Sequence, residues 1–231
     1  GYIFEEFKKF LIKNNLINEN WNGLNILVQN ASTVGLLDLK ILQGKKEKSS
    51  SFFDDLNNKK FKILYLLGSD NFEFQKNDEF IVYQGSHGDR GAEIADLILP
   101  SATYTEQNGL YENLEGRIQE CKKASYPIGE ALEDWKIFNQ IIKKLGSKDY
   151  KVNFDELRKE VLETVPNFSE INKLPKKSVI KTNNIETSFF SEKIFVRELD
   201  YYYTNSISRS SKTMSDCRHI RQKIKKDGTN N

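Results

Sequence analysis

Cysteine and histidine are scarce in this sequence, which limits the redox and metal chemistry open to the chain. Its 231 residues include two cysteines, Cys121 and Cys217, and two histidines, His87 and His219. Neither cysteine belongs to a C-x-x-C pair, and two cysteines cannot build a disulfide framework. An iron–sulfur cluster usually takes four thiolates, so this chain alone is expected to hold none. Two histidines are also too few for a histidine-rich metal site.

Long apolar runs and an excess of one charge are missing as well. No run of eighteen apolar residues occurs, so we expect no segment that spans a bilayer. The 35 basic and 33 acidic residues leave a net charge of +2, so no global field directs the protein to nucleic acid or to an anionic membrane. Hydrophobic residues make up 38% and aromatic residues 12% of the chain, which is enough for a core. This composition excludes collagen, a coiled coil and a wholly disordered protein.

The composition also carries information about the coding genome. Lysine outnumbers arginine by 28 to 7, beside 22 asparagines and 21 isoleucines. Codons for lysine, asparagine and isoleucine are rich in A and T, which indicates the genome of an endosymbiont, a protist or an organelle. The first residues, GYIFEEFKKF, lack the apolar region of a secretory signal, and Glu5 and Glu6 argue against a transit peptide. If the protein works in an organelle, we expect it to be made there or already processed.

Short apolar runs that end in glycine and small polar residues predict buried parallel strands. Residues 61–67 lead into Gly-Ser-Asp, residues 80–83 lead into Gln-Gly-Ser, and residues 98–100 are a candidate third strand. Strand, short crossover and strand favour an α/β, Rossmann-like sheet. Two or three strands do not make a stable doubly wound sheet alone, so we expect another chain to supply the missing strands.

Helical periodicity surrounds these strands. Residues 4–13 predict an amphipathic helix whose aromatic stripe needs a cover, and part of residues 25–42 also has a near-helical period. Helices are predicted at residues 135–145 and 154–164, whereas residues 101–120 contain no long apolar run. Residues 209–231 hold seven basic and two acidic side chains. Such a tail can bind RNA phosphate, anionic lipid or an acidic partner protein.

A glycine-rich loop follows the second predicted strand. Gly85-Ser86-His87-Gly88-Asp89-Arg90-Gly91 could cradle a phosphate or a pterin pyrophosphate, although it is neither G-x-G-x-x-G nor a P-loop. We favour a tight turn whose glycines take positive φ. His87 has no second histidine, cysteine cluster or serine elbow beside it, which favours a hydrogen-bonded loop residue over a catalytic one. Asp89 is expected to cap the turn or the following helix.

Two further groups of residues invite a chemical role. Glu106, Glu112 and Glu115 could perform acid–base work, but their neighbour Arg117 favours ion pairing. Cys121 precedes two lysines, which would favour a thiolate if the side chain were exposed. It has no partner base in the sequence, so we favour an ordinary thiol.

Several motifs in one order resemble a known protein family. The stretch A-D-L-I-L-P at 95–100, followed by T-E-Q-N-G-L-Y-E-N-L-E-G-R-I-Q at 105–119, is similar to the molybdopterin oxidoreductase superfamily. The preceding Y-Q-G-S-H-G-D-R-G-A at 83–92 resembles one branch of it. That branch is the largest iron–sulfur subunit of respiratory complex I, NADH–ubiquinone oxidoreductase, in its mitochondrial and alphaproteobacterial form. Four more segments resemble the same branch: N-A-S with L-D-L at 30–39, L-L-G-S-D at 66–70, E-D-W-K-I at 133–137, and Y-T-N-S-I-S-R with K-T-M and a cysteine at 203–217.

The resemblance implies a division of the chain. Residues 1–165 would be the C-terminal portion of a molybdopterin-oxidoreductase-like domain that a partner chain completes. Residues 166–231 would be an extended linker and a basic tail, partly helical. The family's ferredoxin-like region, which holds the Fe–S clusters, has no counterpart in this sequence. We therefore expect the clusters in a partner chain, the N-terminal half of a split subunit, unless the sequence is a fragment.

The resemblance also implies a structural function. The chain would belong to the peripheral arm of complex I, on the matrix side of the mitochondrial inner membrane, and the mitochondrial genome could encode it. It would support electron transfer from NADH to ubiquinone beside other peripheral-arm subunits, with no catalytic residue, cofactor or metal of its own. Seven residues are expected to be structural: Gly85, His87, Gly88, Asp89, Gly91, Glu115 and Arg117. Of these, Glu115 and Arg117 are expected to hold the glycine-rich loop through a partly buried pairing.

Two other functions stay open. In a true molybdopterin enzyme, residues 85–91 and 106–117 would touch the pterin, and molybdenum or tungsten would be present at stoichiometric level. An RNA-binding protein would rest on the basic tail alone and predicts steeply salt-dependent binding. The tail lacks aromatic residues after Tyr203, which argues against base stacking, so we expect no nucleic-acid partner.

Overall fold

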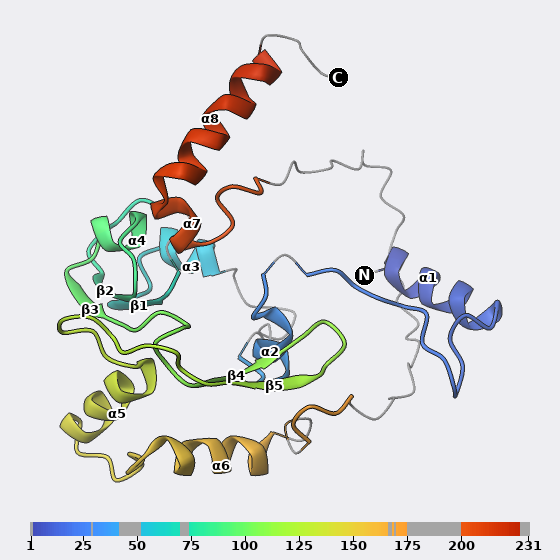
Figure 1. The fold of residues 1–231 in the computed structure, drawn as a ribbon, viewed down its shortest axis with the longest axis horizontal. Helices are drawn as coiled ribbons and strands as arrows, with labels where there is room; N and C mark the ends of the chain where they lie inside the picture. The colour runs from blue at the N-terminus through green and yellow to red at the C-terminus, as the bar shows by residue number, and fades with distance from the viewer. Residues whose placement is uncertain are drawn as a thin grey trace. The chain divides into compact units, whose positions relative to one another are not determined.

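The computed structural model describes residues 2–28, 30–41, 52–69, 74–165, 168, 170–174 and 200–226 (Figure 1). The chain forms two compact units. Unit 1 comprises Gly1–Gly44, Leu110–Cys121 and Asp155–Val196. Unit 2 comprises Lys45–Gly109, Lys122–Phe154 and Arg197–Asn231. Each unit is therefore built from segments that lie far apart in the sequence.

Unit 2 is built on a three-stranded parallel sheet, which confirms the predicted α/β class. The strands are β1 (Ile63–Leu67), β2 (Phe80–Gly85) and β3 (Leu97–Pro100), and their order in the sheet is β1-β2-β3. Ile63 pairs with Phe80, and Val82 pairs with Leu97. Four consecutive residues of β2 are buried, as expected for the central strand of a parallel sheet. The core of this unit consists of Leu56, Leu64, Leu66, Ile81 and Tyr83.

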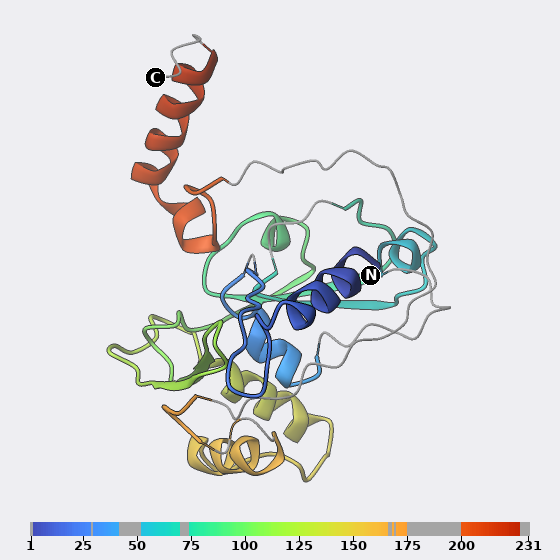
Figure 2. The same ribbon diagram turned by 90° about the vertical axis from the view of Figure 1, so that its right-hand side faces the viewer.

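Five helices accompany the sheet in the described part of unit 2: α3 (Phe52–Asn57), α4 (Arg90–Glu93), α5 (Asp134–Lys144), α7 (Ser206–Ser210) and α8 (Lys212–Lys226). Helix α5 forms as predicted, with an aspartate in its first turn and two lysines in its last turn, which suit the helix dipole. It ends before Gly146, whose φ of +78° suits glycine. Helix α7 begins at a capping box between Asn205 and Ser208. Helix α8 continues from it as a straight basic helix (Figure 2).

Unit 1 combines two helices at the amino end with a short hairpin and a further helix. Helix α1 (Tyr2–Lys13) and helix α2 (Thr33–Asp38) come first. Strands β4 (Gly109–Glu112) and β5 (Ile118–Cys121) form a two-stranded sheet, and α6 (Phe154–Thr164) follows later in the chain. The predicted helices at 4–13 and 154–164 are confirmed. The hairpin was not predicted, because its four-residue strands contain no apolar run.

The aromatic stripe of α1 stays exposed within this chain. Phe7 and Phe10 are 48% and 55% exposed and stack on one another, with ring centroids 6.5 Å apart. The opposite charges of Glu5 and Lys8 are buried instead and form an ion pair of 2.8 Å. The stripe therefore lacks a cover among the residues that the structure describes. No helix in the described part of the chain is long and apolar enough to cross a membrane.

Candidate functional site: the glycine-rich loop and the unit 1 pocket

The loops after all three parallel strands meet at one edge of the sheet in unit 2. The Gly68 N–H after β1 donates to the Gln84 carbonyl oxygen of β2, at 2.8 Å. The Ser101 N–H after β3 donates to the Gly85 carbonyl oxygen, at 3.1 Å. Sheets of this kind bind ligands outside the carboxyl ends of their strands. The glycine-rich loop therefore lies where a ligand would be sought.

The glycines of this loop serve a different purpose from the predicted one. Among the described glycines, positive φ angles occur at Gly68, Gly116, Gly129 and Gly146. Gly85, Gly88 and Gly91 do not take positive φ, so the backbone angles predicted for these three residues were wrong. Two of the three loop glycines instead make room for Tyr83. A Cβ on Gly91 would lie 2.9 Å from Cδ2 of Tyr83, and a Cβ on Gly85 would lie 2.6 Å from its Cζ. Gly88 is open, with Ala92 Cβ at 3.8 Å.

The tyrosine ring and its hydrogen bond fix the loop. Tyr83 is 2% exposed, and its hydroxyl donates to the His87 carbonyl oxygen at 2.7 Å. Nδ1 of His87 lies 3.0 Å from Oγ of Ser86. His87 is therefore a hydrogen-bonded loop residue, as favoured from the sequence.

Asp89 joins the loop to the C-terminal segment. Its carboxylate accepts the Arg90 N–H at 2.9 Å and caps α4, which confirms the predicted cap. The second oxygen, Oδ2, lies 2.5 Å from Nε of Arg209 on α7, in a pair whose side chains are 27% and 15% exposed. Sequence reasoning missed this pair because the two residues are 120 positions apart. Asp89 and Arg209 both lie in motifs that carry the family resemblance, and this shared membership was the available sign in the sequence that the two residues matter.

A buried polar network links the sheet to α5. Gln84 is completely buried; its amide donates to Asp134 at 2.6 Å, and its carbonyl oxygen accepts from the Tyr65 hydroxyl. Gln107 donates to the other Asp134 oxygen at 2.9 Å and accepts the Asp134 N–H. Burial raises the pKa of the Tyr65 phenol above its usual value, and the Asp134 carboxylate raises it further. The network satisfies its buried polar groups internally, which is typical of a structural role.

Glu133 anchors the same helix through three donors. It is 3% exposed and accepts from Lys123, Lys136 and Nε1 of Trp135, at 3.1, 3.0 and 3.1 Å. Burial alone would raise the pKa of Glu133. The hydrogen bonds from Lys136, Trp135 and Lys123 outweigh burial and hold this pKa below its usual value. Glu133 therefore stays ionised and fixes the start of α5.

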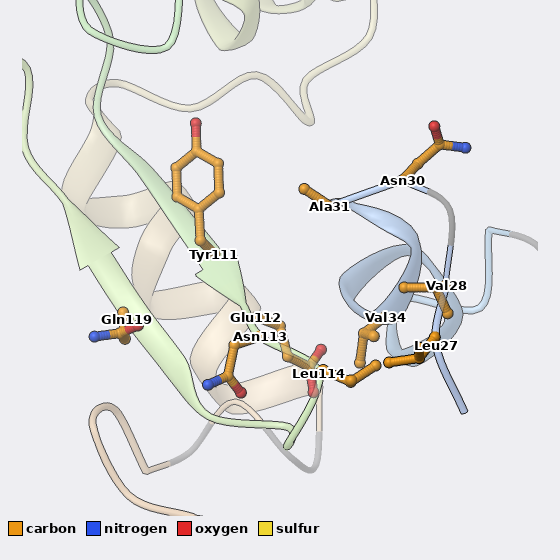
Figure 3. A pocket seen from close by; sticks show the side chains of 10 residues that line it. All are labelled: Leu27, Val28, Asn30, Ala31, Val34, Tyr111, Glu112, Asn113, Leu114 and Gln119. Atoms are coloured by element: carbon orange, nitrogen blue, oxygen red, sulfur yellow. The ribbon is translucent and has the colours of Figure 1, made fainter. Parts of the chain in front are cut away.

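Unit 1 contains an open, mostly apolar pocket of about 350 Å³ (Figure 3). Its lining residues come from the segment before α2, from α2 itself and from the β4–β5 hairpin: Leu27, Val28, Asn30, Ala31, Val34, Tyr111, Glu112, Asn113, Leu114 and Gln119. Glu112 is the charged residue in this lining. Burial first, and then the charge and a hydrogen bond of Asp38 on α2, raise the pKa of Glu112 to about 7. Its Oε2 is buried and has no hydrogen-bond partner among the residues that the structure describes.

The predicted acidic cluster separates into individual contacts. Glu106 accepts the Thr103 N–H at 3.1 Å, in a turn of unit 2. Glu115 is exposed in the hairpin turn, where Asn113 Oδ1 accepts the N–H groups of both Glu115 and Arg117. Nη1 of Arg117 donates to the Asn172 carbonyl oxygen at 2.9 Å. Within the described residues Glu115 and Arg117 form no ion pair with one another, which differs from the expected pairing because the asparagine closes this turn instead.

Among the described residues, the cysteines and the carboxylates do not assemble into a metal site. Cys121 is half-buried in β5, and Cys217 is exposed on α8. In the part of the chain that the structure describes, no group of three or more His, Cys, Asp or Glu side chains is placed to hold a metal ion.

Comparison with known proteins identifies the family. The model of the molybdopterin oxidoreductase family matches residues 2–144. The chain belongs to this family. A second model, for the C-terminal region of the G-type subunit of NADH-ubiquinone oxidoreductase, matches residues 169–217.

Curated relatives fall within the same branch of the molybdopterin oxidoreductase family. The NADH-ubiquinone oxidoreductase 75 kDa subunit of Reclinomonas americana is 39% identical over 87% of this chain and 29% of the relative. The G-type subunit of the NADH-quinone oxidoreductase of Rickettsia bellii is 37% identical over 95% of this chain and 31% of the relative. The mitochondrial NADH-ubiquinone oxidoreductase 78 kDa subunit of Neurospora crassa is 36% identical over 93% of this chain and 29% of the relative. The resemblance predicted from the motifs is confirmed, and the chain spans about a third of the length of these relatives.

The family name implies a molybdopterin cofactor, whose fit can be tested at two places. Molybdopterin carries phosphate, so its site should offer free backbone N–H groups or cationic side chains. At the glycine-rich loop, the space beside Gly85 and Gly91 is taken by the Tyr83 ring, and Asp89 contributes a carboxylate. In the unit 1 pocket, the charged lining residue is Glu112. The acidic pocket wall does not suit an anionic cofactor, and at the loop the Tyr83 ring occupies the space that such a cofactor would need.

Proposed function

We propose that this chain is a structural part of respiratory complex I that binds no redox centre itself. The carrying observation is the pairing of two family matches in one chain, the molybdopterin oxidoreductase model followed by the C-terminal model of the G-type subunit. The relatives named as NADH-ubiquinone and NADH-quinone oxidoreductase subunits support the same assignment. The chain supports electron transfer from NADH to quinone and supplies no catalytic residue.

The domain is completed by a partner chain, the cluster-bearing N-terminal half of a split large subunit. Two features support a partner. Outer strands β1 and β3 expose Ile63 at 66% and Ile98 at 51%, and the aromatic stripe of α1 is exposed as well. Such surfaces favour association over an isolated monomer. Other peripheral-arm subunits cover the remaining surface, and residues 1–165 and 166–231 act as the domain portion and the tail.

The site of action is the matrix side of the mitochondrial inner membrane. A relative from Neurospora crassa carries the word mitochondrial in its name, which supports this location. The AT-rich composition supports a mitochondrial gene. The alternative, a molybdopterin enzyme that works with its cofactor, is favoured by the family match alone.

Replacing each cysteine by serine tests the absence of a redox centre. In complex isolated from the source organism, Cys121→Ser and Cys217→Ser should leave every Fe–S signal in the electron paramagnetic resonance spectrum unchanged, because an Fe–S cluster needs more thiolates than this chain has. Loss of one cluster signal at normal assembly would contradict the proposal. Molybdenum or tungsten at one atom per chain would favour the alternative.

A further inference from the structure

The unit 1 pocket has a polar atom that nothing in the described part of the chain satisfies. Glu112 is 8% exposed, and its Oε2 lacks a hydrogen-bond partner there. Buried polar atoms in folded proteins are almost always paired, so an unpaired carboxylate oxygen in a pocket wall points to a missing donor. Figure 3 shows the Glu112 side chain extending from β4 toward α2 and Leu114.

We propose that this pocket receives a lysine side chain of a partner polypeptide. Its ammonium group would donate to Oε2 of Glu112, and its four-carbon stem would pack on Leu27, Val34 and Leu114. The inference deepens the proposed function, since it rests on a partner and adds the chemistry by which that partner is recognised.

The charges near Glu112 favour a cation over a neutral donor. Asp38 on α2 hydrogen-bonds to Glu112 and adds a second carboxyl group. Two neighbouring carboxyl groups disfavour each other's ionisation, and an incoming cation relieves that repulsion. An ammonium group can therefore use both the unpaired oxygen and the local negative charge.

The shape favours lysine over arginine. One carboxylate oxygen is unpaired, whereas the flat guanidinium of arginine is suited to two oxygens of the same carboxylate. A lysine presents a compact ammonium on an apolar stem, and that stem matches a lining that is mostly apolar. The pocket is thus apolar along its walls and acidic at one point.

The rim favours a polypeptide over a free amine. Three large apolar side chains that line the pocket are exposed: Leu27 85%, Tyr111 47% and Leu114 42%. Exposed apolar side chains gathered at one place mark protein interfaces, since a small ligand would leave most of them in water. The lysine would be the anchor of a wider apolar contact.

Lysine footprinting of the complex isolated through the tagged full chain tests this inference. Acetic anhydride acetylates accessible lysines, and mass spectrometry measures the rate at each one. We expect one lysine of a partner polypeptide to be protected in the wild type. That lysine should react at least about tenfold faster in Glu112→Gln, because truncating one side of a buried charge pair releases the other. The matched control is Glu115→Gln, on the exposed turn of the same hairpin, and it should keep the protection.

Equal acetylation of every partner lysine in wild type and Glu112→Gln would overturn the inference. If Glu112→Gln does not assemble, Asp38→Asn, which leaves Glu112 in place, is measured in the same way and read by the same rule. A complex that lacks other NADH-quinone oxidoreductase subunits would overturn the proposed function as well. An intact complex with an unchanged footprint would overturn only the lysine site.

Discussion

Tyr83 decides which glycines of the loop can be replaced. Its ring lies against Gly85 and Gly91, and its hydroxyl holds the His87 carbonyl group. Sequence reasoning treated all the loop glycines alike, because three glycines after a strand suggest unusual backbone angles. The structure separates them by the space around each one, which depends on a side chain that the spacing does not reveal.

Gly91→Ala should therefore be destabilising and Gly88→Ala nearly neutral. A Cβ on Gly91 would meet the Tyr83 ring and also the Ser69 carbonyl oxygen at 3.1 Å, so we expect a cost of about 1–3 kcal/mol. The Gly88 change has open space and should stay within about 0.5 kcal/mol. Hydrogen exchange of the β2 amides in the assembled complex measures both. Equal effects of the two changes would contradict this account of the loop.

Glu133 gives a residue-level prediction with a pH dependence. Its pKa is lowered in the folded protein, so it stabilises the fold above the unfolded value near pH 4.3, and this contribution is lost as pH falls through the folded value. Glu133→Gln should cost about 1–3 kcal/mol at pH 7 and less below about pH 4, because charge-assisted hydrogen bonds are lost. Hydrogen exchange of the α5 amides in the complex reports the change.

The control for Glu133 is its exposed neighbour Glu130. Glu130→Gln should leave exchange in α5 unchanged at both pH values, since this side chain lies on the surface. A Glu133→Gln effect that grew as the pH fell would contradict the assigned direction of the pKa shift.

At the scale of elements, the sheet and the longer helices could be predicted from local patterns. The runs at 61–67 and 80–83 became β1 and β2, because apolar runs ended by glycine suit buried parallel strands. The hairpin β4–β5 could not be predicted, since its strands are short and depend on the Asn113 turn. The tail was expected to be partly helical, and helix α7 begins there at the Asn205 capping box, a local signal that the sequence analysis did not use.

The candidate sites depended on contacts between distant segments. The loop and its Asp89 cap could be located from the glycine spacing, and the cap was confirmed. The pocket joins residues around α2 to a hairpin about 80 positions later in the sequence. The ion pair between Asp89 and Arg209 joins residues that are 120 positions apart. Periodicity and spacing report near neighbours along the chain, so these pairings lay outside what the sequence patterns could predict.

The ion pair between Asp89 and Arg209 should hold helix α7 on the loop. Asp89→Asn keeps a good helix cap but removes the charge, and Arg209→Met removes the partner. Each change should speed hydrogen exchange in α7, with a cost of about 1–3 kcal/mol for this partly buried pair. The double variant should cost less than the sum, because both changes remove one interaction.

Lys223→Met, on the exposed part of α8, is the control for this cycle and should leave α7 exchange unchanged. Strictly additive effects of Asp89→Asn and Arg209→Met would show that the pair does not act as a unit.

At the scale of the whole molecule, the chain has the surfaces of a component more than those of an independent protein. Apolar side chains are exposed on the outer strands of the sheet, on α1 and around the unit 1 pocket. The polar groups at the strand ends are satisfied by one another, and the loop that could cradle a phosphate is filled by a tyrosine. A chain of this kind is expected to depend on partners for its stability and to contribute no redox chemistry.

The most direct test is purification of the tagged chain from its source organism in mild detergent, with identification of every polypeptide that travels with it. We expect a large assembly that oxidises NADH, with the chain in equal amount to a polypeptide that bears Fe–S clusters. Recovery of the chain as a monomer, with a sharp cooperative thermal transition of its own, would contradict the account.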